Sequence, residues 1–426
     1  MFAKIKNNSL LSSSAVYLFS NLLAAAIPFA LLPILTRYLS PVEYGEIAMF
    51  QTLIAALAAF VGLSGVGAAA RKYYDTDLNT ADFKAYIGSC FQVLVGSSLI
   101  VFFIIFLFRQ RISELVSLNE KWIFLSVAVA ATGFIIQMRL GLWQVKKSAR
   151  PYGILQVSQS LSNMLLSLLF VVTLAQGAAG RINAQVYVTF LLAGISIYLL
   201  RRDDFLTFKW RPDQIREILN FGVPLIPHIG GIFILSSFDR FVINSKLGLA
   251  ETGVYMVAVQ LTSAMGIVFD AVNKAYVPWL YERLKRDLPE EKRQIVRWTY
   301  VYFMFVLLIA GLAFLIGPYL TVLIAGERYA EAGKVVGWLA LGQAFVGMYL
   351  MVTNYTFYAR KTGLLSLSTI VSGLLNIGLL ILFIDLFGLV GAAMAFAISM
   401  AVRFLFTWFV AQKCHPMPWV QFLKSA

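Results

Sequence analysis

The chain has 426 residues, of which 60% are hydrophobic and only 13% are charged, and its mean hydropathy is +0.78. A soluble domain carries about 25% charged residues, so this composition excludes a soluble enzyme. The net charge of +14 has to be judged by where the basic residues fall, because in membrane proteins they follow topology.

Apolar runs as long as a bilayer is thick recur from end to end. Ser89 to Phe108 and Leu364 to Phe383 are apolar for about 20 residues, enough to cross the hydrocarbon core as a helix. An outer-membrane barrel would instead show alternating segments of about 10 residues. We predict an all-α polytopic membrane protein with about twelve transmembrane helices, at 11–36, 45–70, 85–108, 121–142, 152–174, 182–200, 219–245, 251–277, 298–325, 333–357, 364–384 and 388–411.

Glycine and proline mark two special positions within these helices. The glycines from Gly62 to Gly67 lie inside the second helix and predict close packing against a neighbour. Gly317 and Pro318 predict a break or kink near the outer end of the ninth helix.

Basic residues set the orientation, since Lys and Arg near helix ends stay on the cytoplasmic side. With the N-terminus inside, 24 of the 35 Lys and Arg residues fall in inner segments, 8 in outer segments and 3 within helices. Both termini are therefore expected in the cytoplasm. Because topology explains the basic charge, we expect no nucleic-acid partner.

The inner loop at 201–218 divides the twelve helices into two halves of six. Leu39, Glu43 and Gly45 recur as Leu247, Glu251 and Gly253, each displaced by 208 positions. We predict an N-terminal lobe at 1–205 and a C-terminal lobe at 206–426. An even number of helices in each half makes them parallel repeats, with a cavity between the halves.

Polar residues follow one face of several predicted helices. A polar side chain in lipid is expensive unless it faces protein or water, so such stripes indicate either packed helix seams or a wet cavity. Because helices one, five, eight and eleven, drawn from both halves, carry such stripes, we predict a shared wet cavity. We expect helices one, two, seven and eight to line a cationic cavity between the lobes. Uncharged candidates for binding substrate there are Gln156, Asn163, Gln260 and Asn376.

Ionisable residues within the helices predict an anionic ligand. Arg240 lies next to Asp239, Lys274 is four residues after Asp270, and Arg403 has no carboxylate within four residues on its own helix. Arg suits a diphosphate because its planar fork makes two parallel charge-assisted bonds. We expect Arg240, Lys274, Arg403 and Arg37 to bind substrate. The Asp270 and Lys274 pair admits a purely structural interpretation too.

Several signals of catalysis are missing from the sequence. No GxxxxGK[ST] phosphate loop, HExxH motif or carboxylate cluster is present. We therefore expect no enzyme activity, no cofactor and no metal site. Without a nucleotide site, uphill transport needs a coupling ion, H⁺ or Na⁺, and Asp239 and Asp270 are the candidate coupling groups.

Three segments match a known family in order and spacing. They are Pro33 with Thr36 to Pro41, Glu43, Tyr44 and Gly45; Asp239 to Phe241 with Leu247, Gly248, Glu251, Gly253 and Tyr255; and Ala275 to Pro278 with Tyr281. The chain thereby resembles Wzx-type flippases, the polysaccharide-transport branch of the MOP exporter superfamily.

The resemblance implies a two-lobed transporter in the bacterial cell inner membrane. Its substrate would be an undecaprenyl-diphosphate-linked oligosaccharide, the repeat unit of O-antigen, capsule or exopolysaccharide, moved from the inner to the outer leaflet by alternating access. Its partners would be membrane lipid and the polymerase and chain-length proteins of the same pathway. Two alternatives stay open, a MATE-like drug or cation exporter and an integral-membrane polysaccharide polymerase.

Overall fold

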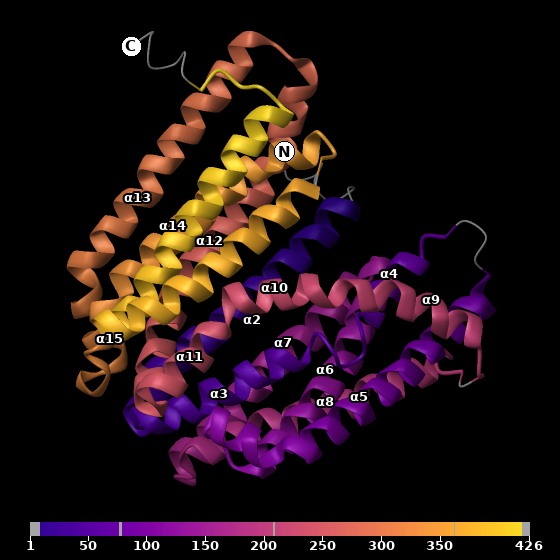
Figure 1. The fold of residues 1–426 in the computed structure, drawn as a ribbon. Helices are drawn as coiled ribbons and strands as arrows, with labels where there is room; N and C mark the ends of the chain where they lie inside the picture. Colours follow the sequence, from indigo (N-terminus) through magenta and orange to yellow (C-terminus); the bar gives the residue numbers. More distant parts are fainter. Residues whose placement is uncertain (1–8, 76–78, 208, 362, 420–426) are drawn as a thin grey trace. The chain divides into compact units, whose positions relative to one another are not determined.

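A computed structural model describes residues 9–75, 79–207, 209–361 and 363–419 (Figure 1). Both chain ends, including Lys4, Lys6 and Lys424 of the topology count, lie outside the described residues. Ten helical segments of the described part are long and apolar enough to cross a membrane, and that part contains no strand. The predicted all-α polytopic class is therefore confirmed, whereas the number of twelve spans and the side of the termini stay predictions.

The long helices largely follow the predicted ranges. They are α2 (Ser9–Tyr38), α5 (Thr80–Val116), α6 (Glu120–Val145), α7 (Ala149–Leu168), α8 (Gly177–Arg202), α12 (Leu249–Arg286), α13 (Pro289–Ala325), α14 (Ala332–Tyr358) and α15 (Gly363–Cys414). A π-helical turn, Leu169–Thr173, continues α7.

The second predicted helix, at 45–70, is interrupted in the structure. It forms α3 (Pro41–Leu57) and α4 (Gly65–Lys72), separated by seven non-helical residues. Gly62 there has φ +78°, and a Cβ would stand 2.3 Å from the Phe134 ring, so only glycine fits. Its N–H donates to Ser97 Oγ at 2.9 Å, which replaces a lost helical bond. The continuous helix was wrong, although the close packing at Gly62 was expected.

The seventh predicted helix, at 219–245, is also divided. It comprises α9 (Pro212–Gly222), a 3₁₀ turn at Val223–Leu225, α10 (Ile226–Ser236) and α11 (Phe238–Leu247). Pro224 has no N–H to donate, so the α-helix gives way to the turn at this position. A second break follows at Ser237.

At two further sites, one at Gly388 and one at Gly317 and Pro318, the structure differs in whether the helix continues. Gly388 leaves helical geometry inside α15, with φ +58°, and so separates the predicted eleventh and twelfth helices. By contrast, α13 continues through Gly317 and Pro318 to Ala325, so a break there is wrong, whereas a kink stays a prediction. Gly333 of α14 lies against Pro318, where a Cβ would stand 2.7 Å from its Cα. This packing supports the helix where proline removes a backbone bond.

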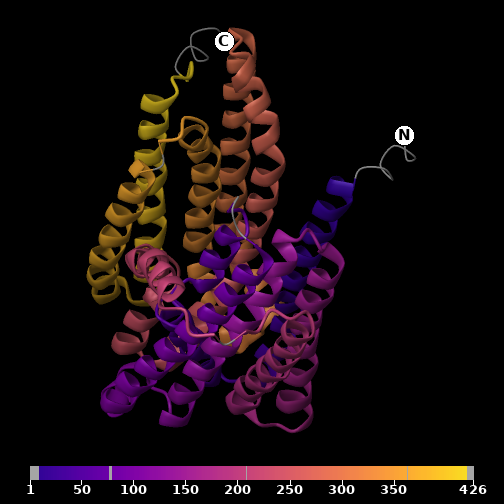
Figure 2. The ribbon, with the colours of Figure 1, turned by 90° about the vertical axis from the view of Figure 1, so that its right-hand side faces the viewer.

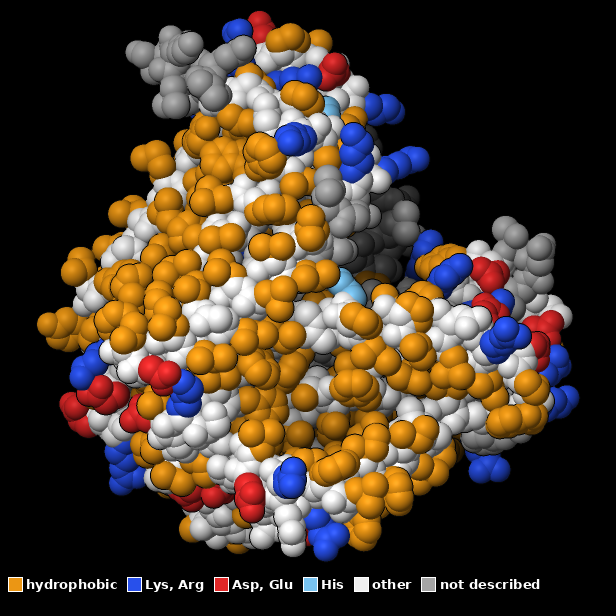
Figure 3. Space-filling model, viewed as in Figure 1, with side chains coloured by type: hydrophobic (Ala, Val, Ile, Leu, Met, Phe, Trp, Pro, Cys, Tyr) orange, Lys and Arg blue, Asp and Glu red, His pale blue; other side chains and the backbone are white. Residues whose placement is uncertain are grey.

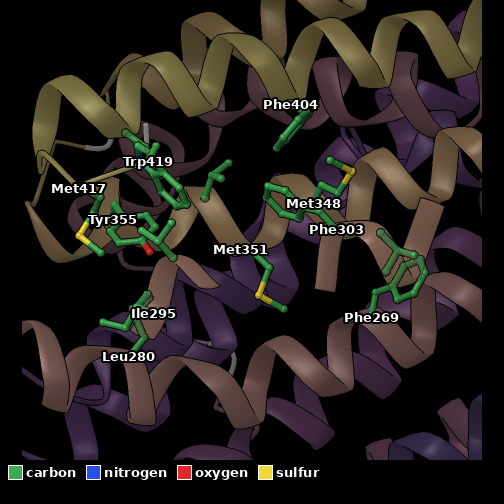
Figure 4. Close-up of a cluster of buried hydrophobic side chains, with 14 of the residues drawn as sticks. Phe269, Leu280, Ile295, Phe303, Met348, Met351, Tyr355, Phe404, Met417 and Trp419 are labelled. Atoms are coloured by element: carbon green, nitrogen blue, oxygen red, sulfur yellow. The ribbon is translucent and has the colours of Figure 1, made fainter. Parts of the chain in front are cut away.

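The chain forms two compact units, Met1–Phe233 (unit 1) and Ile234–Ala426 (unit 2). The proposed lobe boundary at 205/206 stays a prediction. In unit 2, α14 packs against α12, α13 and α15, as Figures 1 and 2 show. The core between these helices is aromatic near the C-terminal end of α15, where Met417 and Trp419 lie beside Tyr355 (Figure 4).

The surface of unit 2 along α13 is hydrophobic. Figure 3 shows apolar side chains along this surface and charged side chains at its two ends. On α13, Met304, Leu315 and Leu323 are each at least 70% exposed. At the ends, Arg286 pairs with Glu291 and Lys334 with Glu331. An apolar band between charged ends is the surface that a bilayer requires.

One buried ion pair holds α6 to the end of α8 in unit 1. Arg139 is 2% exposed, and its guanidinium bonds the Asp203 carboxylate at 2.5 Å and lies 4.2 Å from the Trp143 ring. Burial alone would raise the pKa of Asp203, but the bonds and charges of Arg139 and Arg202 hold that pKa below its usual value.

We expect Asp203→Asn to lower the melting temperature in detergent at pH 7. The buried Arg139 would lose its carboxylate, which costs about 1–3 kcal/mol. Asp204→Asn is the matched control, because Asp204 pairs with Lys84 on the surface and is 77% exposed. Such exposed pairs contribute little, so the control should melt like the wild type.

The same pair predicts a pH dependence. A carboxylate with a lowered folded-state pKa stabilises the protein above its unfolded pKa, about 4, and loses that contribution as pH falls through the folded pKa. The difference in melting temperature between wild type and Asp203→Asn should therefore shrink below about pH 4. An undiminished difference at acidic pH would mean that Asp203 acts through packing.

Candidate functional site

Unit 1 contains a cavity of about 500 Å³ at the interruption between α3 and α4. Ala58, Val61 and Ser64 of the interruption line it, together with residues in the middle of α6, α7 and α8. Discontinuous helices commonly build binding sites near the bilayer midplane. This cavity, called the amide cavity below, therefore has the position expected of a transport site.

Uncharged polar groups converge on the amide cavity. They are Ser64, Gln137, Gln159, Asn163, Gln185 and Thr189, and no Asp, Glu, Lys, Arg or His is among its lining residues, all of which are described. The side-chain amides of Gln137, Gln159 and Gln185 make no hydrogen bond with any described residue. Gln137 is exposed although it lies within a membrane-spanning helix. Such groups need water or a ligand.

Asn163 is the one predicted site residue that lines this cavity. Its Oδ1 accepts from Arg181 Nη1 at 2.6 Å. No carboxylate of the described residues forms an ion pair with Arg181. Arg181 was not among the predicted site residues, because the sequence placed it in an outer segment just before the helix predicted to start at 182. The spacing of Arg181, Gln185 and Thr189, four residues each, is a polar stripe that would have indicated the site.

Arg240 lies in a buried cluster at the break between α10 and α11. It is 6% exposed, and its guanidinium bonds Asp239 Oδ1 at 3.2 Å and the Ser236 carbonyl. Tyr255 donates to Asp239 Oδ2 at 2.7 Å. Within unit 2 the charge of Arg240 is thus balanced by Asp239, and its contact with substrate stays a prediction.

Lys274 and Asp270 form an exposed pair on α12. Their atoms lie 2.6 Å apart, and the side chains are 62% and 49% exposed. The neighbouring Asn273 accepts from Asn354 at 2.8 Å, which ties α12 to α14. The predicted i,i+4 pairing is therefore present in the structure.

Arg403 differs from the other two cations because no described carboxylate pairs with it. Its guanidinium lies 4.1 Å from the Tyr349 ring and donates to Thr369 Oγ1 at 3.3 Å. Its Nε is buried and has no partner. No hydrogen bond or ion pair in the described part joins Arg240, Lys274 and Arg403, so a shared cavity for them stays a prediction.

The remaining predicted site residues are dispersed. Asn376 is buried at 3% exposure, and Gln156 has a buried Oε1 without a partner. Gln260 is half-buried, and Arg37 is exposed. Among the described residues no group of three His, Cys, Asp or Glu side chains could hold a metal ion.

Two sequence relatives extend over most of the chain. An uncharacterised membrane protein of Haemophilus influenzae is 26% identical over 376 residues, which cover 87% of this chain and 90% of that protein. The "Probable low-salt glycan biosynthesis flippase Agl15" of Haloferax volcanii is 24% identical over 419 residues, which cover 92% of this chain and 82% of that protein.

The solved structures that are similar in fold include a flippase and a multidrug transporter. The lipid II flippase MurJ in its inward closed conformation has a TM-score of 0.77 at 14% identity, covering 97% of this chain and 89% of that one. An inward-facing multidrug resistance MATE family transporter of the MOP superfamily has a TM-score of 0.68 at 16% identity, covering 96% of each chain. Likeness at such low identity establishes the fold alone.

The family comparison agrees with the motifs found in the sequence. The family described as "Polysaccharide biosynthesis protein" matches residues 10–284, more than half of the chain. The resemblance found in the sequence is confirmed at the level of the family: the chain belongs to the polysaccharide biosynthesis protein family.

Proposed function

We propose that this protein moves an undecaprenyl-diphosphate-linked oligosaccharide from the inner to the outer leaflet of the bacterial inner membrane by alternating access. The family and the flippase relative support transport of a lipid-linked glycan rather than catalysis. The polymerase and chain-length proteins of the same pathway would consume the product.

Arg403 is the observation that carries this proposal. A guanidinium within a membrane-spanning helix is costly unless a partner or ligand neutralises it, and no described carboxylate does so here. Beside the Tyr349 ring and Thr369, most of its five donors have no hydrogen-bond partner among the described residues. A diphosphate accepts two parallel bonds from such a fork. An anionic substrate therefore suits Arg403.

The two carboxylates expected to couple transport argue against a cation exporter. Asp239 already accepts bonds from Arg240 and Tyr255, and Asp270 pairs with Lys274. A cationic drug would need a carboxylate that no internal cation neutralises. The charge arrangement thus favours an anionic substrate, although the fold is shared with MATE transporters.

We expect Arg403→Lys to slow flipping about tenfold and Arg403→Ala about a hundredfold, because a lost charge-assisted bond costs about 1.5–3 kcal/mol. The measurement is leaflet exchange of the lipid-linked oligosaccharide in proteoliposomes. Lys413→Ala is the matched control, since Lys413 lies on α15 and is exposed. Normal flipping by Arg403→Lys, combined with poor folding of Arg403→Ala, would make Arg403 a packing residue.

We also propose that Asp239 or Asp270 couples flipping to a proton or sodium gradient. Asp239 is the better placed of the two, because its carboxylate joins α11 to α12 through Tyr255 beside a helix break. Neutralising the Asp239 carboxylate would release Arg240 and Tyr255 from it together. A change at this position can therefore alter how the two helices are held.

Asp239→Asn should abolish the dependence of flipping on an imposed gradient while leaving the protein folded. Asp270→Asn tests the second candidate in the same vesicles. Asp385→Asn is the control, since Asp385 is 62% exposed and pairs with Lys246. If both Asp239→Asn and Asp270→Asn retain full gradient dependence, neither carboxylate couples transport.

A further inference from the structure

The amide cavity has a chemistry different from that of Arg403. No charged residue lines it, and Arg181, the cation beside it, is bonded to Asn163, so the lining offers no cation to pair directly with a phosphate or a carboxylate. Its volume of about 500 Å³ lies in the usual range of small-ligand pockets. The ligand it suits is therefore neutral, polar and about the size of one or two sugar rings.

We propose that the amide cavity binds a neutral N-acetylated sugar of the transported glycan, and that Arg181 is a positioning residue for it. This inference rests on the proposed function, because it assigns the sugar end of the same substrate.

Amide side chains are suited to an acetamido group. Each glutamine amide both donates and accepts, so it can satisfy the N–H and the C=O of a second amide at once. Gln137, Gln159 and Gln185 bring three such amides from α6, α7 and α8, and none is occupied by a described residue. A sugar hydroxyl uses only part of this capacity.

Apolar side chains complete the match. Val61, Val129 and Phe134 line the same cavity, and they offer a surface for the acetamido methyl group and for the apolar face of a sugar ring. Burying a methyl group contributes about 0.8 kcal/mol. A sugar without the acetamido group would leave amides unpaired and apolar surface uncovered, which lowers its affinity.

Arg181 fixes the direction of the Asn163 amide. Because Oδ1 of Asn163 accepts from Arg181, its Nδ2 group remains to donate to a ligand, and no described residue accepts from it. Ser167 also donates to the Asn163 backbone carbonyl, which holds this turn of α7. Arg181 therefore acts through Asn163 and need not touch the sugar.

The test uses the full-length protein in lipid nanodiscs and three probes: N,N′-diacetylchitobiose, cellobiose, which lacks the acetamido groups, and a digalacturonate, which carries carboxylates. Calorimetric titration should show chitobiose binding at least tenfold tighter than either other probe. Equal binding of chitobiose and cellobiose, no chitobiose binding, or tightest binding of the digalacturonate would each overturn the proposal.

Substitutions locate the site. Gln159→Leu and Thr189→Val should each weaken chitobiose binding, the first about tenfold, whereas Gln92→Leu on α5, outside the cavity, should not. If Gln159→Leu does not fold, Thr189→Val and Asn163→Leu decide the matter. Unchanged chitobiose binding in the folded cavity variants would overturn the assignment.

Arg181→Met tests the positioning role through the ratio of the chitobiose and cellobiose affinities. If Arg181 merely stabilised the fold, its loss would weaken the binding of both sugars alike. Loss of direction at Asn163 should instead reduce the preference for chitobiose over cellobiose several-fold, in a protein with an unchanged secondary structure. A preference that stays constant would overturn the positioning role.

The outcomes separate this inference from the proposed function. Selective chitobiose binding without any flipping in proteoliposomes would retain the sugar site and reject flipping. Flipping that depends on Arg403, without selective chitobiose binding, would retain the flippase and reject the sugar site.

Discussion

The structure depends on one constraint: a polar or charged group within a bilayer must have a partner, a ligand or water. Most such groups here have protein partners. Arg139 pairs with Asp203, and Arg240 is held by Asp239 and the Ser236 carbonyl. Arg403, which no described carboxylate pairs with, and the unbonded amides of the unit 1 cavity are among the exceptions, and we expect a ligand at both.

These two places differ in their chemistry and so suit different parts of the proposed substrate. A guanidinium without a carboxylate suits a diphosphate, and a cavity of amides with apolar walls suits a sugar. Arg403 belongs to unit 2 and the amide cavity to unit 1.

Much of the fold could be predicted, because long apolar runs leave few alternatives to membrane-spanning helices. The interruption between α3 and α4 could not, since Gly62 reads as a close-packing residue until Phe134 is known to occupy the space beside it. Pro318 shows the opposite error, because α14 supports a helix that proline would otherwise break. Sequence alone does not contain these tertiary contacts.

The site was predicted only in part for a similar reason. Asn163 and the isolated Arg403 followed from helical spacing and from the cost of charge in lipid. Arg181 was missed because α8 begins at Gly177, five residues earlier than predicted. Whether Arg240 is free or neutralised depends on the direction of the Asp239 side chain at a helix break, which periodicity does not determine.

The central claim is that this protein transports a lipid-linked glycan. Its most direct test is leaflet exchange of an undecaprenyl-diphosphate-linked oligosaccharide in vesicles with and without the purified protein, alongside a phospholipid and a cationic drug. We expect the protein to accelerate movement of the glycan lipid alone. Acceleration of the cationic drug, with no effect on the glycan lipid, would contradict it.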